Sequence, residues 1–113
     1  MITIYHNPRC AKSRAGLAYL ESKNVEFEIR QYLKELLTVE ELSELISKSD
    51  MPPIDFVRKQ ESYFKENLKG KDLSNEELIA EMIKEPKLIQ RPIIYDGNKA
   101  ILANPPENLD KII

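Results

Sequence analysis

Hydrophobic and charged residues alternate in the first third of the chain, where Val25, Phe27 and Ile29 are separated by charged side chains. This period-two pattern predicts a β-strand with one buried face. Residues 2–5 form another short strand pattern, and residues 11–22 between them carry apolar side chains at helical spacing. The order strand, helix, strand predicts a βαβ unit whose two strands are parallel.

The middle of the chain carries helix signals. Residues 38–41 and 74–77 are both capping boxes, and each precedes apolar residues at helical spacing. Two consecutive prolines can begin a further helix over residues 54–58, and Pro86 ends the last helix of this region. The sequence therefore predicts a helical segment over about residues 38–86.

Strand patterns return near the end of the chain. Residues 93–95 and 99–102 are apolar runs on either side of an Asp-Gly pair, which predicts a β-hairpin. Residues 105–113 begin with two prolines and can form a last helix. The element order is that of an α/β, thioredoxin-like fold (β-α-β … β-β-α) with a helical insertion. We expect residues 1–113 to form a single domain.

Composition and charge exclude several classes of protein. The formal net charge is −2, which lacks the basic excess of nucleic-acid-binding proteins. No run approaches the ~18 apolar residues of a membrane span. The chain contains one cysteine, which can form neither an internal disulfide nor a cysteine-rich zinc site. We expect a cytoplasmic monomer with no metal site and no nucleic-acid or membrane partner.

Cys10, the single cysteine, lies at the break between the first predicted strand and the first predicted helix. Unpaired N–H groups and the helix dipole at such a position favour the thiolate over the thiol. Four side chains within four residues can also stabilise a negative sulfur, namely His6, Arg9, Lys12 and Arg14. The alternative is an inert, buried cysteine, which the polar neighbours disfavour. Because the thiolate is the nucleophile, we expect thiol chemistry at Cys10.

Four segments together resemble one known family. Residues 5–14 (YHNPRCAKSR) are similar to the active-site segment of the glutaredoxin-coupled arsenate reductases, and residues 88–94 (LIQRPII) to their second signature. Residues 55–58 resemble the arginine-bearing helix between these motifs, and residues 105–107 the C-terminal segment. The motifs occur in the family's order, so the resemblance covers nearly the whole chain.

The resemblance implies roles for individual residues. Cys10 would be the catalytic nucleophile that attacks arsenate, and Arg58 and Arg91 would bind the oxyanion through their planar guanidinium groups. The peptide bond before Pro92 would be cis, with this proline facing the thiol. The alternative for both arginines is an ordinary surface salt bridge.

Three further positions are candidates with open alternatives. His6 can lower the Cys10 pKa as a charged imidazolium or as a hydrogen-bond donor, or can merely tether the loop. Arg14 lies one helical turn after Cys10 and can touch the anion or form a salt bridge. Asn104 stands where the family often carries a third arginine, so it can hydrogen-bond an oxyanion but brings no charge. Losing a charge-assisted contact costs ~1.5–3 kcal/mol.

The resemblance and the single cysteine imply an external thiol. No second cysteine can resolve the product, so glutathione would act as co-substrate and glutaredoxin would break the mixed disulfide, without a tightly bound cofactor. One alternative is a glutathione-dependent monothiol reductase of another substrate, which Asn104 favours. The other is a Spx-like regulator that binds RNA polymerase, although such proteins commonly carry a Cys-x-x-Cys motif where this chain has Ser13.

Overall fold

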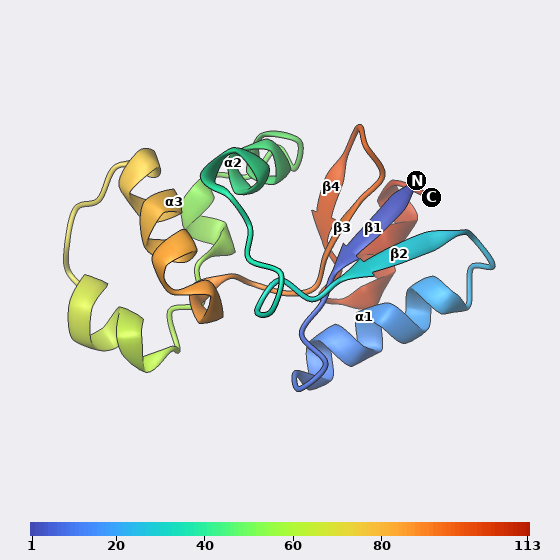
Figure 1. The fold of residues 1–113 in the computed structure, drawn as a ribbon, viewed down its shortest axis with the longest axis horizontal. Helices are drawn as coiled ribbons and strands as arrows, with labels where there is room; N and C mark the ends of the chain where they lie inside the picture. Colours follow the sequence, from blue (N-terminus) through green and yellow to red (C-terminus); the bar gives the residue numbers. More distant parts are fainter. The chain divides into compact units, whose positions relative to one another are not determined.

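A computed structural model describes residues 1–113, which fall into two compact units (Figure 1). The first unit comprises Met1–Glu35 and Arg91–Ile113, and the second comprises Leu36–Gln90. The helical insertion expected over residues 38–86 lies within the second unit. The assignment of the whole chain to a single domain stays a prediction.

A four-stranded sheet in the order β2-β1-β3-β4 forms the centre of the first unit. Its strands are β1 (Ile2–Tyr5), β2 (Phe27–Arg30), β3 (Ile93–Tyr95) and β4 (Ala100–Leu102). β1 is parallel to β2 and antiparallel to β3, and β3 is antiparallel to β4. The α/β fold of the thioredoxin-like type is confirmed, including the parallel βαβ unit and the C-terminal hairpin.

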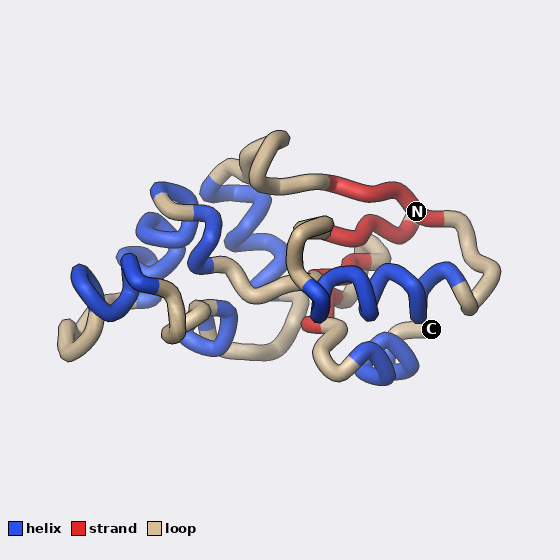
Figure 2. The backbone as a smooth tube through the Cα atoms, turned by 90° about the horizontal axis from the view of Figure 1, so that it is seen from below, coloured by secondary structure: helices blue, strands red, loops and turns tan.

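Helix α1 (Ala11–Glu21) and the 3₁₀ helix η4 (Pro106–Lys111) lie side by side against the sheet (Figure 2). The core of this unit consists of fully buried apolar side chains from the sheet, α1 and η4, namely Ile4, Leu20, Ile94, Ala103 and Leu109. This packing holds the start of α1, and therefore Cys10, at the C-terminal end of β1. The last helix predicted from the sequence is present as a 3₁₀ helix.

Strand β2 corrects one expectation about burial. Ile29 is paired in register with the fully buried Ile4, yet 46% of Ile29 is exposed. β2 is the edge strand of the sheet, so a side chain on it has a neighbouring strand on one side only. The alternation therefore predicted the strand correctly, and Val25 and Phe27 pack against the core, but the expected burial of Ile29 was wrong.

The second unit is built from helices. Its α-helices are α2 (Val39–Ser47) and α3 (Asn75–Lys84), and its shorter turns are η1 (Pro53–Phe56), η2 (Phe64–Leu68) and η3 (Pro86–Leu88). Both α-helices begin with the predicted capping boxes, at Thr38–Glu41 and Ser74–Glu77, in which each side chain bonds the other's backbone N–H. No helix in either unit is long and apolar enough to cross a membrane.

The helix expected over residues 54–58 is present as the 3₁₀ helix η1, which ends at Phe56, two residues earlier than predicted. The 3₁₀ turn ends at Phe56, and Val57 forms an antiparallel β-bridge with Ile89. The N–H of Arg58 donates to the Leu88 carbonyl at 2.7 Å, so this backbone is paired with another segment and cannot continue a helix. Arg58 therefore follows a short turn rather than lying on a helix.

Candidate active site

Cys10 is the N-cap residue of α1, as the sequence predicts. Its backbone is extended, with φ −98° and ψ 123°. The Cys10 N–H donates to the Asn7 carbonyl at 3.1 Å, and the Cys10 carbonyl accepts from the Arg14 N–H at 3.0 Å. The loop is thereby closed before the sulfur and the helix begins after it, so Sγ faces the unpaired N–H groups of the first turn.

The surroundings of Cys10 favour its thiolate. Partial burial is the largest single influence and raises the Cys10 pKa. The hydrogen bonds from the Ser13 N–H, the Arg91 guanidinium and the Lys12 N–H, together with the charge of Arg91, outweigh it. The net result is a Cys10 pKa below its ordinary value, as the sequence predicts. The Cys10 side chain does not accept a hydrogen bond as a helix cap in the structure. The effect of these donors is therefore on the pKa of the thiol.

Ser13 is a residue whose part in the site the sequence reasoning missed. Its side chain is completely buried, with Oγ 2.8 Å from His6 Nδ1. The same Oγ accepts the Asn7 N–H at 3.0 Å. Ser13 thus fixes the loop before Cys10 through its side chain and stabilises the thiolate through its backbone. The available signal was its place three residues after a helix N-cap, where backbone N–H groups point back at the capping atom.

His6 tethers the loop through Ser13, and its surroundings disfavour the protonated imidazole. Burial lowers the His6 pKa below its ordinary value, and the positive charge of Arg14 lowers it further. His6 is also not among the groups that lower the Cys10 pKa. The thiolate-stabilising role expected for His6 stays a prediction, and the lowered pKa disfavours the imidazolium form of it, because a buried imidazole beside a cation resists a second positive charge. The contact with Ser13 makes His6 part of the loop's scaffold.

Arg14 also contacts the loop before Cys10. Its guanidinium donates from Nη1 to the Pro8 carbonyl at 2.9 Å. The side chain is exposed, and Arg14 is not among the groups that lower the Cys10 pKa. The thiolate-stabilising role expected for Arg14 stays a prediction, because the hydrogen bond that the structure gives its guanidinium goes to the Pro8 carbonyl.

Arg91 is the charged side chain that the fold brings to Cys10, since its guanidinium lowers the pKa of the thiol both as a hydrogen-bond donor and through its charge. The Arg91–Pro92 peptide bond is cis, as expected, and Pro92 is buried. The Pro92 carbonyl accepts the Ala103 N–H at 3.0 Å, which joins this segment to the residue after β4. A β-carbon added to Gly16 of α1 would overlap the Pro92 ring. The lack of a side chain at Gly16 therefore lets the segment bearing Arg91 lie against the helix that begins at Cys10.

Sequence and structure comparisons assign this site to a family. The family model for the ArsC family matches residues 5–112. The chain belongs to the ArsC family. A protein of Haemophilus influenzae named arsenate reductase is 40% identical to it over 117 residues, covering 99% of this chain and 98% of that relative. The solved structure of an arsenate reductase from Vibrio cholerae matches with a TM-score of 0.92 at 38% identity, covering 99% of this chain and 97% of that one.

The ArsC-family match confirms the resemblance stated from the sequence. A Bacillus subtilis relative named regulatory protein MgsR also matches, at 29% identity over 112 residues, covering 98% of this chain and 89% of that relative. Family membership alone therefore does not separate an enzyme from a regulator. The residues around Cys10 must therefore be used to distinguish an enzyme from a regulator.

Two of the expected oxyanion-binding residues, Arg58 and Asn104, have partners in the structure other than Cys10. Arg58 belongs to the second unit, where its Nη1 forms an ion pair with Glu61 Oε2 at 2.7 Å. Asn104 belongs to the first unit and is exposed, and its carbonyl accepts a hydrogen bond from the Asn108 side chain at 3.4 Å. Their roles in anion binding stay predictions.

Proposed function

We propose that this protein is an arsenate reductase-like thiol oxidoreductase in which the Cys10 thiolate attacks arsenate. The observation that carries the proposal is the position of Cys10 as the N-cap of α1, where the Arg91 guanidinium and the backbone N–H groups of Lys12 and Ser13 lower the pKa of the thiol. Such a site both activates a thiolate and offers donors to an incoming oxyanion. The names of the full-length relatives support arsenate as the substrate.

Reduction of arsenate to arsenite requires two electrons, which the oxidation of two thiols to one disulfide supplies. The Cys10 thiolate attacks arsenic, and an oxygen of arsenate leaves as water after protonation. A glutathione thiol then supplies the second sulfur, so that a Cys10–glutathione disulfide forms while arsenic leaves as arsenite. In balance, two thiols and one arsenate give one disulfide, one arsenite and one water. A glutaredoxin thiolate then attacks the glutathione sulfur and releases Cys10 as the thiolate.

Each residue near Cys10 has a defined role in these reaction steps. Arg91 holds the thiolate before the attack and an arsenate oxygen during it, because one guanidinium offers several donors in one plane. The Lys12 and Ser13 N–H groups act on the same charge from the helix. Arg58 would add a second cation only by sharing its guanidinium with Glu61. Asn104 would contribute a neutral donor.

Two other functions fit the same fold. A monothiol reductase of a different substrate would use the same Cys10 and glutathione steps, and the neutral Asn104 favours it. A regulator that binds RNA polymerase is disfavoured by Ser13, because a buried serine bonded to His6 provides no second thiol for a disulfide switch. Retention of Arg91 beside the sulfur also favours an enzyme that handles anions.

A coupled assay distinguishes these functions. The purified protein is mixed with glutathione, a glutaredoxin, glutathione reductase and NADPH, and NADPH oxidation is followed with arsenate or with a low-molecular-weight disulfide as substrate. The proposal predicts arsenate-dependent turnover that Cys10→Ser abolishes. Turnover with disulfides alone would identify a monothiol reductase. Turnover with neither substrate would contradict an enzymatic role.

A further inference from the structure

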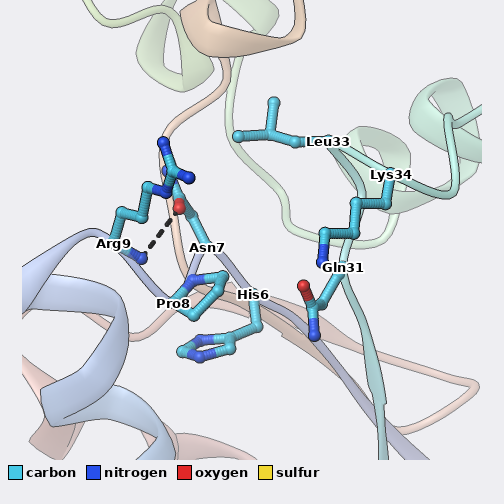
Figure 3. Close-up of a pocket in the computed structure, with 7 residues that line it drawn as sticks. All are labelled: His6, Asn7, Pro8, Arg9, Gln31, Leu33 and Lys34. Carbon is cyan, nitrogen blue, oxygen red and sulfur yellow. Dashed lines mark hydrogen bonds between the residues drawn. The ribbon is translucent and has the colours of Figure 1, made fainter.

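A cavity of about 200 Å³ lies beside the Cys10 loop, within the first unit (Figure 3). One wall comes from the loop between β1 and α1, and the other from the turn after β2. Arg9 lies on one side, and Gln31 and Lys34 lie on the opposite side, with Pro8 between them (Figure 3).

The polar lining of this cavity suits an anion. Arg9 and Lys34 are both basic, Gln31 adds an amide, and no acidic residue lines the cavity. Neither basic side chain forms an ion pair or a hydrogen bond in the structure. Two cations that face one cavity without a carboxylate between them repel each other, and a bound anion would relieve this repulsion.

The remaining lining suits a short aliphatic segment. Leu33 is 37% exposed, and its side chain and the Pro8 ring supply apolar surface on the same cavity. A free inorganic anion would leave this surface uncovered. A ligand that carries a carboxylate on a small aliphatic or peptide skeleton would use both kinds of surface.

The cavity is lined by residues that directly precede Cys10 in the chain. Arg9 immediately precedes Cys10, so the Cα atoms of the two residues lie about 3.8 Å apart. The Asn7 N–H and carbonyl hold the same loop in place, the first through Ser13 Oγ and the second through the Cys10 N–H. A peptide-like ligand whose thiol lies at Cys10 would therefore place in the cavity a group that stands about one residue from that thiol. In glutathione the glycine carboxylate stands one residue from the cysteine thiol.

We propose that this cavity binds the glycine carboxylate of glutathione while the glutathione sulfur reacts at Cys10. Arg9 and Lys34 hold the carboxylate, Gln31 donates to it, and Leu33 covers the skeleton. This inference rests on the proposed function, which assigns glutathione as the co-substrate. It adds to the proposed function the residues that favour an anionic thiol over a neutral one.

The test uses one reaction that requires no arsenate. The Cys10 thiolate attacks one sulfur of an oxidised disulfide, a mixed disulfide forms, and the other half leaves as a thiolate. The rate constant is measured by mass spectrometry with glutathione disulfide and with the neutral 2-hydroxyethyl disulfide. The ratio of the two rate constants reports carboxylate recognition, because any change in Cys10 reactivity affects both.

The proteins compared are the wild type, Lys34→Ala, the double variant Arg9→Ala/Lys34→Ala, and Lys111→Ala as a charge-matched control on the exposed surface of η4.

The ratio should fall at least about threefold in Lys34→Ala and further in the double variant, as expected for the loss of partly solvated charge contacts. It should stay unchanged in Lys111→Ala. An unchanged ratio in the double variant would overturn the inference while leaving the glutathione step in place. A wild type that reacts with the neutral disulfide but not with glutathione disulfide would instead overturn that step of the proposed function.

Discussion

Gly16 and Pro92 lie so close together that a β-carbon at Gly16 would overlap the proline ring. The two residues join the helix that begins at Cys10 to the segment that carries Arg91. The missing side chain at Gly16 therefore lets these two segments lie in contact.

Gly16→Ala should separate the two segments and raise the Cys10 pKa. The Pro92 ring is buried and its carbonyl is bonded to the Ala103 N–H, so the ring has little room to move. Overpacking of this kind typically costs about 1–3 kcal/mol of unfolding free energy. Urea denaturation measures that loss, and the rate of alkylation against pH measures the pKa. Ala15→Ser, on the exposed face of the same helix, is the control and should change neither quantity.

Arg91→Ala should raise the Cys10 pKa and weaken oxyanion binding by at least roughly tenfold, about 1.4 kcal/mol. The guanidinium supplies both a hydrogen bond and a charge to the sulfur. Arg91→Lys retains the charge and should recover part of the pKa effect, but less of the anion affinity, because an ammonium lacks the planar donor pair. Arsenate or sulfate titration at fixed ionic strength measures the affinity. Equal affinities in all three proteins would show that Arg91 does not hold the anion.

His6 should titrate below the ordinary histidine pKa of about 6.5. Burial and the charge of Arg14 both disfavour its protonated form in the folded protein. The folded pKa is therefore lower than the unfolded one, so the resulting stabilisation is complete above about pH 6.5 and is lost as the pH falls through the folded pKa. The protein has one histidine, so proton NMR gives its titration without assignment. A folded-state pKa at or above 6.5 would contradict this effect of burial and of Arg14.

Asn104→Arg should strengthen anion binding or raise arsenate turnover by restoring the family's third charge. The residue is exposed, so the larger side chain can be accommodated without a new cavity or clash in the core. Asn104→Gln keeps a neutral amide and serves as the control. If Asn104→Arg changes neither affinity nor turnover, and Arg91→Ala leaves affinity unaltered, the site around Cys10 and Arg91 does not bind arsenate.

The sequence predicted those elements whose signals are local. Thr38 and Ser74 begin α2 and α3 because each capping box is complete within four residues. The β3–β4 hairpin forms because Gly97 takes φ +93° and Asp96 Oδ1 accepts the N–H groups of Asn98 and Lys99. Neither feature depends on the rest of the fold.

The errors arose where a distant segment decides the outcome. The helix predicted over residues 54–58 ends at Phe56, because Val57 pairs with Ile89 instead. Ile29 looked like a core residue, but its strand lies at the edge of the sheet. The alternatives left open for His6 could not be narrowed from the sequence, since its burial and its contact with Ser13 are visible only in the structure.

A single-turnover reaction with arsenate and glutathione, in the absence of glutaredoxin, tests the central claim most directly. Arsenite is quantified by chromatography, and the Cys10–glutathione disulfide is quantified by intact-protein mass spectrometry. The account predicts one arsenite for each mixed disulfide formed, with neither product in Cys10→Ser. A mixed disulfide that forms at the same rate without arsenate, or arsenite that appears in Cys10→Ser, would contradict it.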